Sequence, residues 1–298
     1  MGGSMLKQFG ALLAWISGSV AGITAVLYTL GFIVTKSVDR VLGIGLEFTS
    51  RDPVVHIGRG GNVVMHTALI AILPALAVIA VAHAVRWGNA RFGLADRPLL
   101  AGTYRLAAAA ATPVTVVAIV VVALAGMGRF VAPALEVEGL LFATPEQACA
   151  VDGKLARAVV SQDREMLKDS YRNFAICVGL VAGLGVVAWT SLAAKENWIW
   201  LVFTGLAVFL VLVGTPIAYG TLMVRAFAPV VTVDPPAADP AIHMRLLART
   251  DRGVLVWVEY QHKVQWINSA RINSLIVGSD EPILAFDCPE IAPAQPGD

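Results

Sequence analysis

The chain has 298 residues, of which 57% are hydrophobic and only 14% charged, with a formal net charge of +1 and a mean hydropathy of +0.72. This composition excludes a soluble enzyme, a disordered chain and a disulfide-rich scaffold. The near-zero net charge gives no electrostatic basis for binding nucleic acid.

Five apolar stretches contain no Asp, Glu, Lys or Arg. They lie at 10–35, 62–85, 106–128, 173–194 and 198–224. Each is long enough to cross a hydrocarbon core of about 30 Å, which takes about 20 helical residues. The sequence therefore predicts an all-α membrane protein with about five transmembrane helices, in a membrane domain spanning residues 1–228.

The first spanning helix, 10–35, carries Gly18 and Gly22 one turn apart, a spacing typical of close helix packing. The next segment, 36–61, mixes apolar and charged residues. We expect it to lie at the membrane interface as an amphipathic turn. Its glycine cluster at 58–61 lacks the Walker spacing, so we interpret it as a flexible break before the second span.

Prolines interrupt the second and third spans. Pro74 lies at the centre of the second span, where we expect a kink because proline removes a backbone hydrogen bond. The third span contains Thr112, Pro113 and Thr115. A hydroxyl beside a freed carbonyl at membrane depth is a candidate for lining a pore. The alternative is that each hydroxyl bonds to a carbonyl of its own helix.

The longest connection between spans, 129–172, is predicted to be extramembrane and partly helical. Its first part, 129–143, is apolar and irregular. Thr144, Pro145 and Gln147 then fit the N-cap, first and third positions of a helix. Because no proline separates this helix from the fourth span, the sequence allows the two to form one continuous helix.

Only residues 195–197 separate the fourth and fifth spans, which predicts a tight antiparallel helical hairpin. The fourth span has a second small-residue face, formed by Gly179 and Gly183. The fifth span contains Thr215 and Pro216, which repeat the combination of hydroxyl and proline seen in the third. We treat these two residues as further candidates for a pore or kink.

The C-terminal part changes its period from 3.6 to 2. A proline-rich segment, 229–242, predicts a linker. Residues 243–298 are predicted to form a small antiparallel sheet or open barrel of four short strands, followed by a flexible tail. So small a domain buries too little apolar area to be stable on its own. We expect it to pack against the membrane domain or against neighbouring copies of the chain.

The strongest predicted strand, 254–260, alternates between two faces. One face holds Val254, Val256, Val258 and Tyr260, and the other holds Leu255, Trp257 and Glu259. We expect Trp257 or Trp266 in the core of the domain and Glu259 in solvent.

No motif of known catalytic chemistry occurs, and we expect no enzyme activity, metal or cofactor. His66 and His83 share the second span, but no other span supplies a histidine to hold haem between helices. Cys149, Cys177 and Cys288 are sparse and unclustered, which argues against a zinc site or a disulfide framework. Cys149 and Cys288 would pair only if their side of the membrane were oxidising.

Charge-free spans disfavour an ion-coupled transporter, which needs an intramembrane group to bind the ion. We expect a homo-oligomer in the lipid bilayer of a bacterial inner membrane, and two functions remain open. The first is an ion-conducting pore gated by the extramembrane parts. The alternative is a non-conducting scaffold or accessory subunit that binds a protein partner through the C-terminal β domain.

Positive residues near the spans predict the orientation. They are more numerous on the side that holds 36–61 and 129–172. This places the N-terminus outside and the C-terminal domain in the cytoplasm. The connection at 86–105 argues the other way, because it is rich in arginine.

Overall fold

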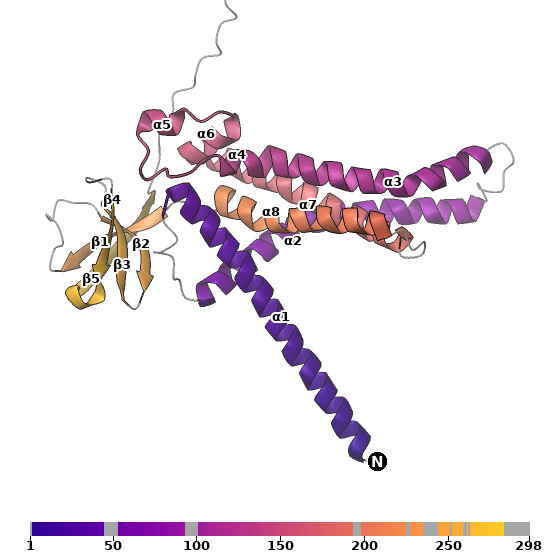
Figure 1. The fold of residues 1–298 in the computed structure, drawn as a ribbon, viewed down its shortest axis with the longest axis horizontal. Coiled ribbons are helices and arrows are strands. Elements are labelled where there is room, and N and C mark those ends of the chain that lie inside the picture. Colours follow the sequence, from indigo (N-terminus) through magenta and orange to yellow (C-terminus); the bar gives the residue numbers. More distant parts are fainter. Residues whose placement is uncertain are drawn as a thin grey trace, which may run out of the picture.

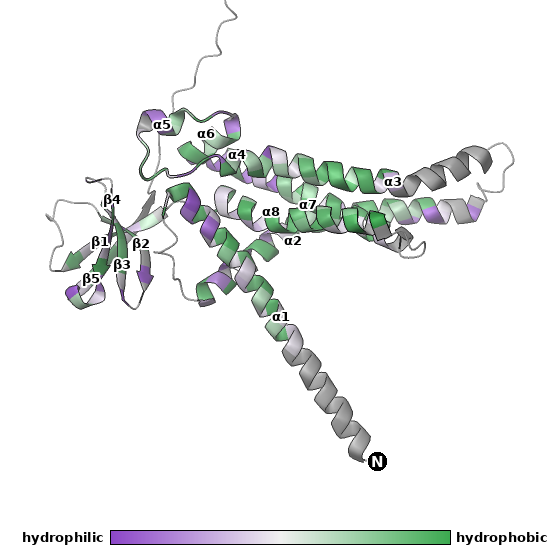
Figure 2. Cartoon of the chain, viewed as in Figure 1, coloured by the Kyte–Doolittle hydropathy of each residue, from purple (hydrophilic) through white to green (hydrophobic). Residues whose placement is uncertain are grey.

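The computed structural model describes residues 2–44, 53–92, 101–192, 198–224, 227–234, 244–250, 252–258, 261 and 263–282. Within them, five helices are long and apolar enough to cross a membrane, which confirms the predicted class. They are α1 (Gly2–Leu42), α2 (Pro53–Phe92), α3 (Ala101–Gly126), α7 (Arg164–Leu192) and α8 (Trp198–Leu222). Four of them form an elongated bundle, whereas α1 begins apart from the bundle, crosses α2 and ends beside the other helices (Figure 1). Hydrophobic residues predominate along the bundle (Figure 2).

The crossing of α1 and α2 corrects two expectations about 36–61. Residues 36–42 continue α1, and the glycine cluster at 58–61 lies inside α2 rather than breaking the chain. The reason is close packing, because a Cβ on Gly60 would collide with the backbone carbonyl of Leu27. Gly31 meets the carbonyl of His56 in the same way. The helices can therefore approach this closely only because a glycine faces the backbone of the other helix at each contact.

A short helical region lies at one end of the bundle, and we call residues 127–163 the cap (Figure 1). It begins with a π-helix, Met127–Val131, that continues α3, and then contains α4 (Ala132–Leu135), α5 (Pro145–Cys149) and α6 (Lys154–Ser161). The predicted start of α5 is confirmed: Thr144 Oγ1 accepts from the backbone N–H of Gln147 at 3.3 Å. In return, the Gln147 side chain accepts from the N–H of Thr144 at 3.1 Å.

The cap helix and the fourth span are not one continuous helix. Gln162 adopts the left-handed conformation with φ 55° and ends α6, where its side-chain Nε2 donates to the Val159 carbonyl at 2.8 Å. Asp163 then begins α7, because its Oδ1 accepts from the N–H groups of Glu165 and Met166, both at 3.2 Å. Side-chain hydrogen bonds of this kind compete with helix continuation. The helix therefore ends at Gln162 although no proline is present to break it.

The C-terminal part is a five-stranded antiparallel sheet in the order β4-β3-β2-β1-β5, which confirms the predicted β domain. Its strands are β1 (Phe227–Asp234), β2 (Met244–Thr250), β3 (Gly253–Val258), β4 (Lys263–Asn268) and β5 (Ser274–Pro282). The sequence predicted four strands and missed β1, which occupies the start of the expected linker. Pro229 is tolerated in it because the register with β5 shifts between Pro229 and Val231.

Both faces of β3 are buried. The valines at 254, 256 and 258 belong to the core of the sheet itself. Leu255 and Trp257 belong instead to a core shared with the membrane helices and the cap. Trp257 is 3% exposed, and its ring meets Phe142 of the cap edge-on at 5.9 Å, whereas Trp266 is 37% exposed. The predicted alternation of the strand is confirmed over 254–258, and Glu259 and Tyr260 lie outside the described residues.

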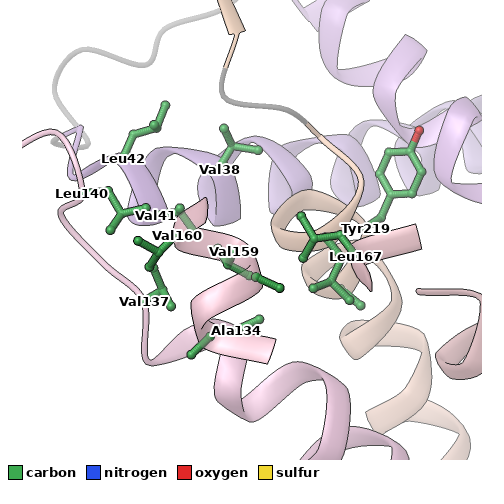
Figure 3. Close-up of a cluster of buried hydrophobic side chains, with 14 of the residues drawn as sticks. Val38, Val41, Leu42, Ala134, Val137, Leu140, Val159, Val160, Leu167 and Tyr219 are labelled. Carbon is green, nitrogen blue, oxygen red and sulfur yellow. The ribbon is translucent and has the colours of Figure 1, made fainter. Parts of the chain in front are cut away.

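The shared core runs from the end of α1 through the cap to α7 and α8. Figure 3 shows part of it, with Val41 of α1 lying near the cap residues Leu140 and Val160. Backbone bonds reinforce it: the N–H of Leu140 donates to the Val41 carbonyl at 2.9 Å. The cap, the sheet and the ends of the spans are therefore packed around one apolar core.

Candidate functional site

The candidate pore residues of α8 are buried and bonded within their own helix. Thr215 is 8% exposed, and its hydroxyl donates to the Val211 carbonyl at 2.7 Å. Pro216 follows it inside α8 and is also buried. This geometry is the one expected of a threonine that bonds to its preceding turn.

The corresponding residues of α3 are less enclosed. Pro113 and Thr115 are half-buried, and Pro113 lies inside the helix. The side chain of Thr112 lies outside the described residues. Helices α3 and α8 pack against each other, so the two proline-containing spans are neighbours in the bundle.

The two small-residue faces behave differently. Gly179 and Gly183 of α7 face α2, where a Cβ on Gly183 would lie 2.8 Å from the Ala75 carbonyl and one on Gly179 would overlap the Pro74 ring. Around Gly18 and Gly22 of α1, by contrast, a Cβ would meet no described atom within 4 Å. The face on α7 packs against α2 of the same chain, whereas the face on α1 has no partner among the described residues.

An apolar groove lies between α1 and the bundle, with a cavity volume of about 400 Å³. We call it the α1 groove. Its walls include Val26 and Leu30 of α1, Thr67 and Ala71 of α2, Val181 of α7 and Thr215 of α8. The Thr67 hydroxyl lies 2.7 Å from both the Val63 carbonyl and the Tyr171 hydroxyl. Both wall hydroxyls thus have partners within the chain, and the groove suits an apolar occupant.

Polar side chains meet on the cap side of the α1–α2 crossing. Thr35 and His56 are both buried, with Thr35 Oγ1 3.2 Å from His56 Nδ1. Arg59 Nη1 donates to the same hydroxyl at 3.0 Å. The rings of Tyr28 and Phe32 meet the His56 ring edge-on at 5.3 and 5.7 Å. We call this group the polar junction.

The polar junction was missed by our sequence reasoning, which treated 36–61 as an interfacial segment. A signal was present: His56 and Arg59 are three residues apart, a spacing that places both on one side of a helix. Buried Asp39 lies one turn after Thr35 on α1. The junction fixes the crossing of two helices, because its bonds join side chains of both.

Among the residues that the structure describes, no three His, Cys, Asp or Glu side chains come together as a metal site would require. Cys177 is a free thiol in α7, whereas Cys149 is disulfide-bonded. Cys288 lies outside the described residues.

Comparison with known proteins gives no further assignment. No protein family, curated protein or solved structure matches the chain.

Proposed function

We propose that the chain is the subunit of a homo-oligomeric membrane scaffold that holds a protein partner on its cap and sheet. The observation that carries this proposal is the shared core, in which Leu255 and Trp257 of β3 pack with the cap and the ends of the spans. A sheet fixed in this way cannot move freely on a linker. It therefore presents its outer surface in a constant position relative to the membrane.

The outer surface of the sheet includes an apolar edge. Strand β5 lies at one end of the sheet order, and its Ile276 and Val277 are 66% and 51% exposed. Exposed apolar side chains on an edge strand are typical of a surface that pairs with another chain. This edge is the proposed partner surface.

The ion-conducting pore remains a second candidate. It is favoured by the contact of α3 with α8, which brings two proline-containing spans together. Their freed carbonyls are tolerated only against protein or water. We rank it below the scaffold because the Thr215 hydroxyl is bonded to Val211 and the groove that it lines is apolar.

Ion flux and oligomer state together distinguish the two functions. The scaffold predicts an oligomer by native mass spectrometry, and liposomes that stay tight at high protein load. The pore predicts ion flux that falls in Thr215→Leu while the oligomer persists. Flux with that behaviour would overturn the scaffold.

Photo-crosslinking in growing cells tests the partner surface. A crosslinking amino acid at Ile276 should give an adduct with another protein. The matched control at Val121, which is 56% exposed on α3, should give none. Equal adducts at both positions would mean that the β5 edge has no special role.

We also propose an orientation, and it reverses the one predicted from positive residues alone. Disulfides persist in oxidising compartments and are rare in the cytosol, so the bond at Cys149 favours an exterior cap. The 86–105 connection, with arginine at 86, 91, 97 and 105, then lies in the cytoplasm, which the positive-inside rule favours for this loop. The larger number of positive residues on the cap side favours the reverse.

A further inference from the structure

We propose that the α1 groove is filled by α1 of a second copy, so that two chains exchange their first helices symmetrically. This rests on the proposed homo-oligomer and names the surface that forms it. The occupant is a helix of the same sequence, and the interface is isologous, each α1 entering the other chain's groove.

The first half of α1 is long and stands apart from its own bundle (Figure 1). Helix α1 begins at Gly2 and makes its close contact with α2 at Leu27 and Gly31. At 1.5 Å per residue, the part before this contact extends about 38 Å. A projecting helix of this length extends well beyond the width of one neighbouring helix, about 10 Å, and is long enough to reach a second chain.

The wall of the groove continues onto this projecting helix. Val26 and Leu30 line the groove, and residues four apart lie on one side of a helix. The next two positions on that side, towards the N-terminus, are Gly22 and Gly18. The glycine face therefore adjoins the groove wall at Val26 and winds away from it around α1, by about 40° for each step of four residues.

This surface is suited to a helix more than to a lipid chain. Inside a bilayer, apolar surface alone drives little association, and helices associate where small residues let their backbones approach closely. The glycines at 18 and 22 have the spacing of that contact. On the bundle side, the groove wall on α2 includes Ala68 and Ala71, which leave room for an incoming helix.

The area comes close to that of a specific contact. A helix face about 25 Å long and 10 Å wide, used on both sides by two exchanged helices, buries on the order of 1,000 Å². Stable interfaces begin at about 1,200 Å². The exchange therefore supplies most of a stable interface, and the crossing of the two α1 helices at Gly18 and Gly22 adds to it.

Cysteine cross-linking of the full-length chain in nanodiscs tests the exchange. Two differently tagged copies, both with Cys177→Ala, carry Ile23→Cys and Leu212→Cys respectively. Ile23 lies on α1 and Leu212 in the groove wall, 60% and 53% exposed. We expect a covalent dimer on oxidation. The control replaces Leu212→Cys with Val121→Cys on α3, which is equally exposed at 56% and should give none.

The second measurement compares the amount of dimer in two variants, each with one glycine replaced by leucine. Gly22→Leu should reduce the dimer about tenfold, the equivalent of about 1.4 kcal/mol, because the bulky side chain keeps the two helices apart. Gly205→Leu on α8 is the matched control, since a Cβ there also meets no described atom within 4 Å. It should leave the dimer unchanged.

Every outcome decides between the proposals. An oligomer in native mass spectra without the Ile23–Leu212 cross-link overturns the exchange and leaves the scaffold standing. Phospholipid retained by such an oligomer would make lipid the occupant. Equal cross-linking at Val121, or equal loss in both leucine variants, also overturns the exchange. A monomer would remove both the exchange and the homo-oligomer.

Discussion

Glycine has opposite consequences at two neighbouring positions of α2. A Cβ on Gly60 would collide with the Leu27 carbonyl, whereas one on Gly61 would meet no described atom within 4 Å. Both Gly60→Ala and Gly61→Ala should gain up to about 1 kcal/mol of helix propensity. Any difference between them therefore measures the crossing of α1 and α2.

We expect Gly60→Ala to lower the thermal unfolding midpoint in detergent, because forced overpacking typically costs about 1–3 kcal/mol. Gly61→Ala should leave the midpoint unchanged or raise it slightly. Equal midpoints in the two variants would show that the helices do not cross at Gly60.

Two tryptophans of the sheet offer a second matched pair. Trp257 is buried against Phe142, whereas Trp266 is 37% exposed. Trp257→Ala should destabilise the protein by about 3–5 kcal/mol, as expected for removing a large ring from a core. Trp266→Ala should cost clearly less in the same calorimetric measurement. If the Trp257 variant unfolded like the unchanged protein, the shared core would be wrong.

At the scale of whole elements, the sequence predicted those helices whose position depends on local composition and capping residues, and not on contacts with distant parts of the chain. The five spans follow from the absence of charge, and the start of α5 follows from Thr144, Pro145 and Gln147. The elements that were missed depend on distant contacts. Strand β1 is a strand because β2 and β5 pair with it on both sides, and no local pattern around Pro229 indicates this.

The same reasoning explains Gly60 in the cluster at 58–61. Local propensity reads the cluster as a break, but the tertiary contact with α1 requires a helix without a side chain at that point. The candidate site divides in the same way. Its glycine spacing and prolines could be found in the sequence. The α1 groove appears only when four helices are placed together, and the polar junction only when α1 crosses α2.

The sheet should not fold when separated from the membrane helices. One side of β3, with Leu255 and Trp257, is part of the core shared with the cap and the spans, and so small a domain has little apolar area to spare. We expect residues 227–298 expressed alone to show no cooperative thermal transition by circular dichroism. A sharp transition would mean that the shared core contributes little to the sheet.

For the molecule as a whole, two observations bear on the proposed orientation, and they disagree. They are the positive residues near the spans and the disulfide at Cys149. More positive residues lie on the cap side, and by the positive-inside rule, which counts positive residues and not net charge, they favour a cytoplasmic cap. The connections on both sides are short enough for their positive residues to count, and the arginine-rich connection at 86–105 favours the opposite orientation. Our proposal of an exterior cap therefore rests on the Cys149 disulfide and on the 86–105 connection, against the larger number of positive residues on the cap side.

Labelling of engineered cysteines in intact cells tests this orientation. After the three native cysteines are replaced by alanine, Asp152→Cys places an exposed thiol on the cap and Arg91→Cys places one at the opposite end of α2. A membrane-impermeant maleimide should label the cap thiol in intact cells, and the Arg91→Cys thiol only after permeabilisation, because the bilayer separates the two. The reverse pattern would restore a cytoplasmic cap. The Cys149 disulfide would then have to persist in a reducing compartment, where such bonds are rare.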